Sequence, residues 1–284
     1  MTNNDIYSSR YTKDRRLKQA QMQRKIRQSQ RRLKNLRAFY KFFLLMSIIG
    51  LIYFIFNHPQ WKLPTTSFDS LDSPALEILN NRIVPSQKIL SALRRNQVPN
   101  QHIFLVKTEN LKKSITQLEP IQNVYIRRFW FPARLQIVVI ERNPIVLISP
   151  DMNVPPIAFF SADGKLIGKE YMPLQDEYDT VLVITYGSGD DYRNWNTQKV
   201  TNFKRLADLV EAESGEQVEY IDYRNPKDVY IKLQTANIRL GSLTAATFDK
   251  IQRLPSLLPQ VKMLNKKVKY IDLRWDTNYI KLDE

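Results

Sequence analysis

The feature that most constrains this chain is an abrupt change of charge at Lys41. Residues 1–41 contain 13 Lys and Arg against two acids, a net charge of +11. Residues 42–61 then carry no charge, and residues 42–56 read FFLLMSIIGLIYFIF. These fifteen residues, nearly all apolar, form about 22 Å of helix, and residues 38–40 can extend it toward the roughly 30 Å of a bilayer core. We therefore predict one membrane-spanning helix over residues 42–61.

The charges on either side of this segment predict its orientation. Basic residues crowd the N-terminal side, whereas Asp69, Asp72 and Glu77 follow the span. The positive-inside rule then places the tail 1–41 in the cytoplasm and the C-terminal part outside it. A cleaved signal peptide is the competing interpretation, but its basic region is short and ends at a small-residue site. The exit here reads NHPQW, which favours an uncleaved, single-pass type II anchor in the cytoplasmic (inner) membrane.

The basic composition belongs mostly to the tail. The whole chain has a net charge of +15, and the residues after position 41 contribute only +4 of it. Such a tail suits anionic lipid headgroups, so the charge does not indicate a specific nucleic-acid partner. The sequence contains no cysteine, which excludes disulfides and thiol chemistry. The extracytoplasmic part is long enough to be stabilised by its own core, as two domains.

The first part of this region reads as a compact α+β unit. Residues 62–73 form a linker rich in Pro, Ser, Thr and Asp. A strand is expected over residues 75–84, followed by helices that begin at the N-cap candidates Ser86 and Thr108. Two alternating strands then flank a turn at Phe131-Pro132-Ala133. Two helices on one face of a three-stranded sheet complete the expected unit.

The second part, residues 145–284, is richer in strands. Asp163-Gly164 predicts a hairpin, and apolar stripes predict helices over residues 197–212 and 244–258. Strands over residues 268–274 and 279–282 close the chain. We expect a mixed β-sheet domain with flanking helices.

No pattern in the chain indicates catalysis. The only histidines, His58 and His102, lie far apart in a chain without cysteine, which makes a poor zinc set. The stretch GSGDD at 187–191 lacks the pattern of a phosphate-binding or an EF-hand loop and reads as a solvated turn. The acid pair Asp176-Glu177 has no visible partner. We expect no catalytic, cofactor-binding or metal-binding residues.

A binding surface is the remaining functional feature. An exposed sheet edge can accept a partner strand through main-chain hydrogen bonds, and the last strand is the best edge candidate. Trp275 and Tyr279 lie there, and such aromatic residues supply much of the energy of an interface. The alternative is that both side chains simply pack on the helix expected at 244–258. The sequence leaves these two interpretations open.

Several motifs together resemble one protein family. The segment VYIRRFWFP at 124–132, followed by LQIVVIERNP at 135–144, is similar to the pattern V-x-R-x-x-P-x-x-L-x-I-x-V-x-E-R-x-P. IFLV at 103–106, LG at 240–241 and YIDLR at 270–274 are similar to further family motifs in the same order. The chain thereby resembles the bitopic cell-division proteins called FtsQ or DivIB.

The resemblance implies a fold and a function. It implies a POTRA domain (β-α-α-β-β) over residues 74–144 and a β domain over residues 145–284. It further implies a non-enzymatic scaffold of the divisome at the division septum, which binds small coiled-coil division proteins of the FtsB/FtsL type by strand addition. Carried over to this chain, the partner-binding residues are Trp275, Thr277, Asn278, Tyr279 and Ile280.

Two other functions compete with this one. POTRA domains also occur in envelope transport and assembly components, although the chain has too few alternating segments after Pro144 for an outer-membrane barrel. A membrane-anchored wall enzyme would need a catalytic constellation, which the sequence does not display.

Overall fold

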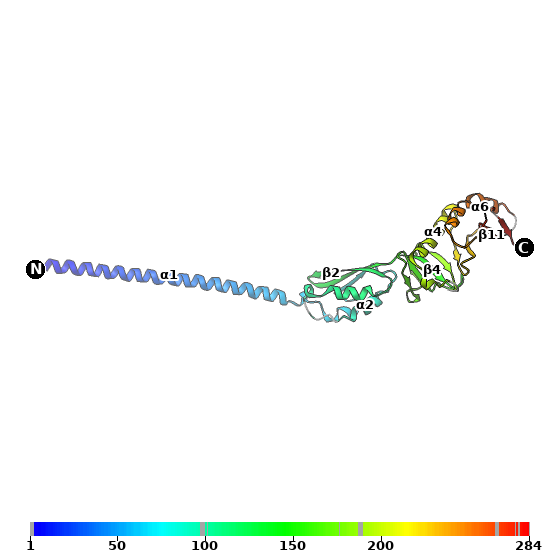
Figure 1. Cartoon of the computed structure of the whole chain (residues 1–284). Helices are drawn as coiled ribbons and strands as arrows, with labels where there is room; N and C mark the ends of the chain where they lie inside the picture. The colour runs from blue at the N-terminus through cyan, green and yellow to red at the C-terminus, as the bar shows by residue number, and fades with distance from the viewer. Residues whose placement is uncertain are drawn as a thin grey trace. The chain divides into compact units, whose positions relative to one another are not determined.

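The computed structural model describes residues 3–96, 100, 102–175, 177–186, 190–264, 267–275, 277 and 279–283. The chain divides into two compact units, residues 1–62 and residues 63–284 (Figure 1). The first unit is dominated by helix α1 (Asn3–Asn57). Its part Arg32–Asn57 is the one described helical segment long and apolar enough to cross a membrane. A short 3₁₀ turn, η1 (Pro59–Trp61), follows.

The apolar helix ends four residues before the expected boundary at residue 61. Its last residue is Asn57, and His58 is extended at φ −61° and ψ 133°. Proline disfavours helical geometry in the residue before it and has no N–H to donate. Pro59 therefore accounts for the end of α1, and the outer boundary of the span stays a prediction.

The POTRA-like unit has the expected order β-α-α-β-β, and this confirms the predicted α+β class. Its sheet has the order β1-β3-β2, with β1 parallel and β2 antiparallel to β3. Alternate residues of β3, among them Leu135, Ile137 and Val139, are buried beneath the helices. The elements are η2 (Thr65–Phe68), β1 (Leu76–Leu79), α2 (Ser86–Arg94), η3 (Ile103–Leu105), α3 (Thr108–Thr116), β2 (Ile121–Trp130) and β3 (Ala133–Glu141).

Three local expectations in this unit were wrong. Ser86 and Thr108 are the first helical residues, and Pro85 and Lys107 occupy the N-cap positions without side-chain capping. The first strand ends at Leu79 because Asn80 adopts a left-handed φ of 64°, which interrupts a strand. After this turn, the backbone N–H groups of residues 82–84 donate to the carboxylate of Glu141.

A second sheet forms most of the C-terminal part. Its strand order is β12-β11-β10-β9-β8-β7-β4-β5-β6. β7 is parallel to β4 and β8, β10 is parallel to β11, and the other described pairs are antiparallel. The strands are β4 (Pro144–Ser149), β5 (Ala158–Ser161), β6 (Leu166–Ile167), β7 (Val181–Ile184), β8 (Tyr220–Asp222), β9 (Val229–Lys232), β10 (Asn237–Gly241), β11 (Val268–Asp272) and β12 (Tyr279–Leu282).

Helices cover one face of this sheet (Figure 1). Phe203 and Leu206 of α4 (Thr197–Ser214) pack with sheet residues such as Ile231 in one buried cluster. Gly215 ends α4 in the left-handed conformation, φ 68°, as its position in the sequence predicts. The remaining helices are α5 (Ala245–Ile251) and α6 (Leu254–Lys262), with the 3₁₀ turns η4 (Lys169–Tyr171) and η5 (Tyr192–Asn194) between strands.

The single helix expected over residues 244–258 is in fact two helices. α5 ends at Ile251 and α6 begins at Leu254. Pro255 lies in the first turn of α6 and has no N–H to donate to the carbonyl of Ile251, so a continuous helix would lack that bond. Both helices still bury their expected apolar residues, Ile251 and Leu254.

Candidate functional site at the sheet edge

The expected edge strand lies at the end of the large sheet. In the described part of the chain, β12 pairs with β11 and with no other strand. Asp272 of β11 lies opposite Tyr279, and Ile271 lies opposite Ile280. A strand at such an edge presents a row of backbone groups to whatever lies beside it.

The hydrogen bonds of β11 identify which groups of β12 face outward. Leu273 donates to the carbonyl of Arg239 on β10 at 2.9 Å. Backbone directions alternate along a strand, so Asp272 points its backbone groups the other way, toward Tyr279. Asp283 likewise donates inward to Lys267 at 2.9 Å. The same alternation leaves the N–H and C=O groups of Ile280 and Leu282 facing the open edge.

The two aromatic side chains at this edge are exposed. Trp275 is 58% exposed and Tyr279 59%, so more than half of each side chain faces solvent. Two basic residues bond the backbone nearby: Lys250 of α5 donates to the carbonyl of Arg274, and Arg253, between α5 and α6, donates to the carbonyl of Trp275. This exposure favours a surface role for the two rings over packing on the helices.

The other expected partner-binding residues lie in different settings. The hydroxyls of Thr277 and Tyr279 are 3.5 Å apart on the same exposed surface. Ile280 instead turns toward the sheet core and is half-buried there, so its backbone rather than its side chain faces the edge. Asn278 lies outside the described residues. Partner binding by this set of residues remains a prediction.

A row of ion pairs lies beside the edge, on the sheet face opposite the helices. Asp272 accepts bonds from the Arg274 guanidinium at 2.8 and 3.0 Å, and Arg239 bonds Asp228 at 2.6 and 2.7 Å. The Arg239 Nη1 atom lies 3.8 Å from the Asp272 carboxylate and links the two pairs. We call Asp228, Arg239, Asp272 and Arg274 the ion-pair row.

The row has a consistent electrostatic effect. The Arg239 guanidinium lowers the pKa of Asp228. Burial raises the pKa of Asp272, but its bonds with Arg274 outweigh this and leave the pKa below its usual value. Tyr230 and Tyr270 flank Arg239, with ring centroids 5.5 and 5.4 Å from its guanidinium carbon. Both carboxylates are therefore charged at neutral pH, and their ion pairs connect β10 with the end of β11 next to β12.

Sequence reasoning missed this row. Two members lie in strands, Arg239 in β10 and Asp272 in β11, whereas Asp228 directly precedes β9 and Arg274 follows β11. They meet because Arg239 lies opposite both Tyr230 and Asp272 in the ladder. The alternation of Tyr270, Asp272 and Arg274 was the available signal, because it places polar side chains on one face.

The family-like motif ERNP has a structural role in the POTRA-like unit. The Glu141 carboxylate accepts the backbone N–H groups of Arg82, Ile83 and Val84, each at 2.8 Å. These are the groups left without a ladder where β1 ends. Arg142 pairs with Asp163 at the turn of the next hairpin. The motif thus stabilises the join between the two sheets.

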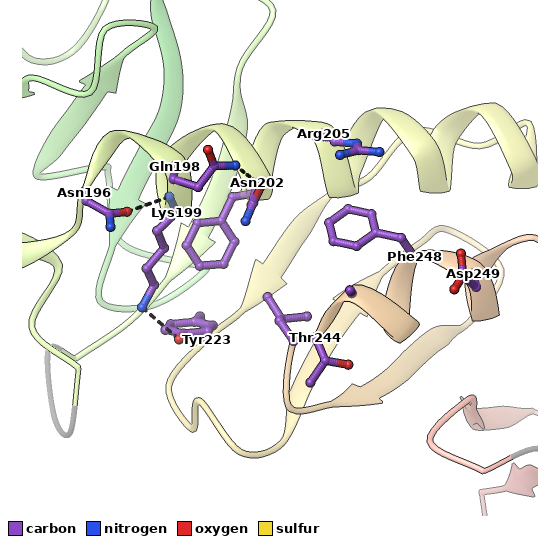
Figure 2. Close-up of a pocket in the computed structure, with 12 residues that line it drawn as sticks. Asn196, Gln198, Lys199, Asn202, Arg205, Tyr223, Thr244, Phe248 and Asp249 are labelled. Carbon is purple, nitrogen blue, oxygen red and sulfur yellow. Dashed lines mark hydrogen bonds between the residues drawn. The ribbon is translucent and has the colours of Figure 1, made fainter.

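A cleft of about 670 Å³ lies between α4 and α5 (Figure 2). Phe203 and Phe248 contribute its apolar wall, and Asn196, Gln198 and Asn202 line it with amides. Its lysine, Lys199, bonds the Tyr223 hydroxyl at 2.9 Å and pairs with Asp190. Tyr223 and Asp190 thus hold the Lys199 amine at the wall of the cleft.

Asp190 shows what the GSGDD segment does. Its carboxylate accepts bonds from Lys199, Tyr223 and the Trp195 indole. Burial raises the pKa of Asp190, but the three bonds together lower it by more. The net pKa therefore lies below its usual value. Asp190 is thus an anchor for the start of α4, whereas residues 187–189 lie outside the described part of the chain, as does Asp176. No three or more His, Asp or Glu side chains among the described residues group to hold a metal ion.

Comparison with known families gives two matches. A model described as cell division protein FtsQ/DivIB, C-terminal, matches residues 157–274. A model described as POTRA domain, FtsQ-type, matches residues 74–142. Together they cover about two thirds of the chain, in the order that the sequence motifs predict. A search of curated proteins gives no match.

Proposed function

The chain belongs to the FtsQ/DivIB family of cell division proteins, and we propose that it is a non-enzymatic scaffold of the divisome. As a membrane-anchored division protein of this family, it interacts with other division proteins. We propose further that it links cytoplasmic and extracytoplasmic partners at the septum. The contact is strand addition at β12.

The open edge of β12 is the observation that carries this proposal. The backbone groups of Ile280 and Leu282 face outward, and the exposed rings of Trp275 and Tyr279 stand beside them. Main-chain bonds supply affinity in strand addition, and neighbouring side chains supply specificity. The ion-pair row connects β10 with β11 beside this edge, and a preorganised edge loses less entropy when a partner strand docks.

The expected partners are small coiled-coil division proteins of the FtsB/FtsL type. Such a protein can offer an extended segment to β12 and an acidic or apolar helix to the surface around Arg274 and Trp275. The Arg274 guanidinium lies 5.8 Å from the Trp275 ring centroid, so a cation and an aromatic face are presented together. This combination suits a partner segment that carries both a carboxylate and an apolar side chain.

The proposed topology follows from the charge step. The tail 1–41 lies in the cytoplasm, residues 42–61 contain the span, residues 62–73 link it to the POTRA domain over 74–144, and the β domain extends over 145–284. The positive charge on the N-terminal side of the apolar segment supports this orientation, because basic flanks stay in the cytoplasm. A reporter fused after Glu284 should register the non-cytoplasmic side.

Depletion and complementation test the proposed function. Cells depleted of the protein should form filaments or chains with unfinished septa, which the parent gene corrects. Tyr279→Lys should fail to correct them and should weaken capture of the FtsB-type partner by about tenfold or more, because it removes an exposed interface aromatic.

The control is Tyr125→Lys. Tyr125 is also an exposed tyrosine on a strand, 53% exposed, but it lies on β2 in the POTRA domain. The Tyr125→Lys variant should restore septation in depleted cells and should capture the FtsB-type partner normally. Normal septation on depletion would contradict the divisome function. Normal partner capture by Tyr279→Lys would contradict the proposed binding site at β12 but not the divisome function.

A further inference from the structure

A second exposed apolar surface lies at the tip of the β2–β3 hairpin. Trp130 is 64% exposed and Phe131 59%. Phe104 and Leu105 of η3 are also exposed, and Arg128 joins η3 to the hairpin by donating to the Phe104 carbonyl at 2.9 Å. We call these four apolar residues the tip surface: Phe104, Leu105, Trp130 and Phe131.

Cations surround the tip surface. Arg127 and Arg134 are exposed on the hairpin, and Lys107 is exposed directly after η3. The Arg134 guanidinium carbon lies 4.3 Å from the Phe129 ring centroid, which holds it beside the apolar tip. Glu109, in the first turn of α3, is the nearest acid along the chain. The surface is therefore aromatic at its centre and mainly basic around it.

The tip lies at the end of the sheet where the chain enters the domain. β1 runs parallel to β3, and Leu76 lies opposite Leu135. The Leu135 N–H donates to the Ala75 carbonyl at 2.8 Å. The start of β1 and the start of β3, directly after the tip, are therefore at the same end of the sheet.

The chain that connects the apolar helix to this domain is short. The apolar helix ends at Asn57, and Leu63 is already fully buried in the POTRA core. Five residues between them can span roughly 20 Å when fully extended. This distance is comparable with the depth of a headgroup region and its first water layers.

We propose that the tip surface docks on the outer leaflet of the membrane. Trp130 and Phe131 enter the interfacial region, where aromatic rings are enriched, and Arg127, Arg134 and Lys107 contact anionic phospholipid headgroups. Each basic residue near an anionic surface strengthens such binding by about fivefold. The contact goes beyond partner capture at β12 and would fix the height and rotation of the domain above the bilayer.

Depth measurement in nanodiscs tests this proposal on the full chain. Because the chain has no cysteine, Phe131→Cys provides a single site for an aromatic fluorophore, with doxyl-labelled lipid as the quencher. Gly50→Cys in the apolar helix, where a β-carbon meets no other atom, reports a fully embedded probe. Gln122→Cys, exposed at the other end of β2, reports a probe away from the membrane.

The expected result is strong quenching at Phe131 and little at Gln122 in discs that contain phosphatidylglycerol. Arg127→Ser with Arg134→Ser should weaken docking by roughly 25-fold, and the exposed Arg193→Ser should leave it unchanged. Equal quenching at Phe131 and Gln122 would overturn the proposal, as would docking that persists in phosphatidylcholine alone. A photo-crosslinker at Phe131 that captures a protein instead of lipid in native membranes would also overturn it.

Discussion

At the scale of single residues, the ion-pair row determines the surface beside β12. Asp228 and Asp272 both have a pKa below the usual value in the folded chain. Such a group stabilises the fold above its unfolded pKa, near 4, and this stabilisation is lost as the pH falls through the lower folded pKa. The ion-pair row should therefore stabilise the β domain at neutral pH, and this stabilisation should be lost in acid as the two carboxylates are protonated.

Asp272→Asn should lower the free energy of unfolding at neutral pH by about 2 kcal/mol, because it weakens the hydrogen bonds from Arg274 and the ion pair with Arg239. It should also make the stability depend less on pH below about 4. Denaturant titrations of the full chain across this range measure both effects. Asp249→Asn, an exposed aspartate on α5, is the matched control, and equal pH dependence in the two variants would contradict this role of the row.

The residues of the site were predictable only in part. Trp275 and Tyr279 were chosen because they flank a terminal strand, and their exposure agrees with that choice. Arg239 and Asp228 were missed because no local pattern relates them to Asp272. Their contacts depend on the pairing of β9, β10 and β11, which a single sequence does not specify.

At the scale of elements, the proposed partner contact depends on the edge strand β12. Ile280→Pro removes an outward N–H, and the alternation of the ladder implies that no bond to β11 is lost. Partner capture should fall, whereas Ile280→Ala, which also loses the packed side chain but keeps the N–H, should retain it. A pull-down with both variants measures the difference. Equal capture by both would argue against main-chain pairing at this edge.

Most elements follow from local chemistry. Alternating residues predicted β2 and β3, and Asp163-Gly164 predicted the β5–β6 turn, where Gly164 has a φ of 79°. The split of α5 from α6 followed from Pro255, which sequence reasoning passed over. The strand order of the large sheet could not be predicted from the sequence. β4 pairs in parallel with β7 across a long connection, and only tertiary packing selects that neighbour.

At the scale of the whole molecule, we propose that the chain separates anchoring from binding. The charge step at Lys41 accounts for most of the net charge and predicts the membrane side of each part. The two family matches then follow the span in order. In this account, the POTRA domain holds the chain close to the bilayer, and the β domain presents its last strand to a division partner.

Hydrogen exchange at single backbone amides tests the central claim most directly. The full chain is compared with and without the extracytoplasmic segment of the FtsB-type protein from the same cell. The outward amides of Ile280 and Leu282 should exchange more slowly once the partner is bound, whereas those of Tyr279 and Lys281, which point toward β11, should change little. Partner binding that leaves the exchange of Ile280 and Leu282 unchanged would contradict strand addition at β12.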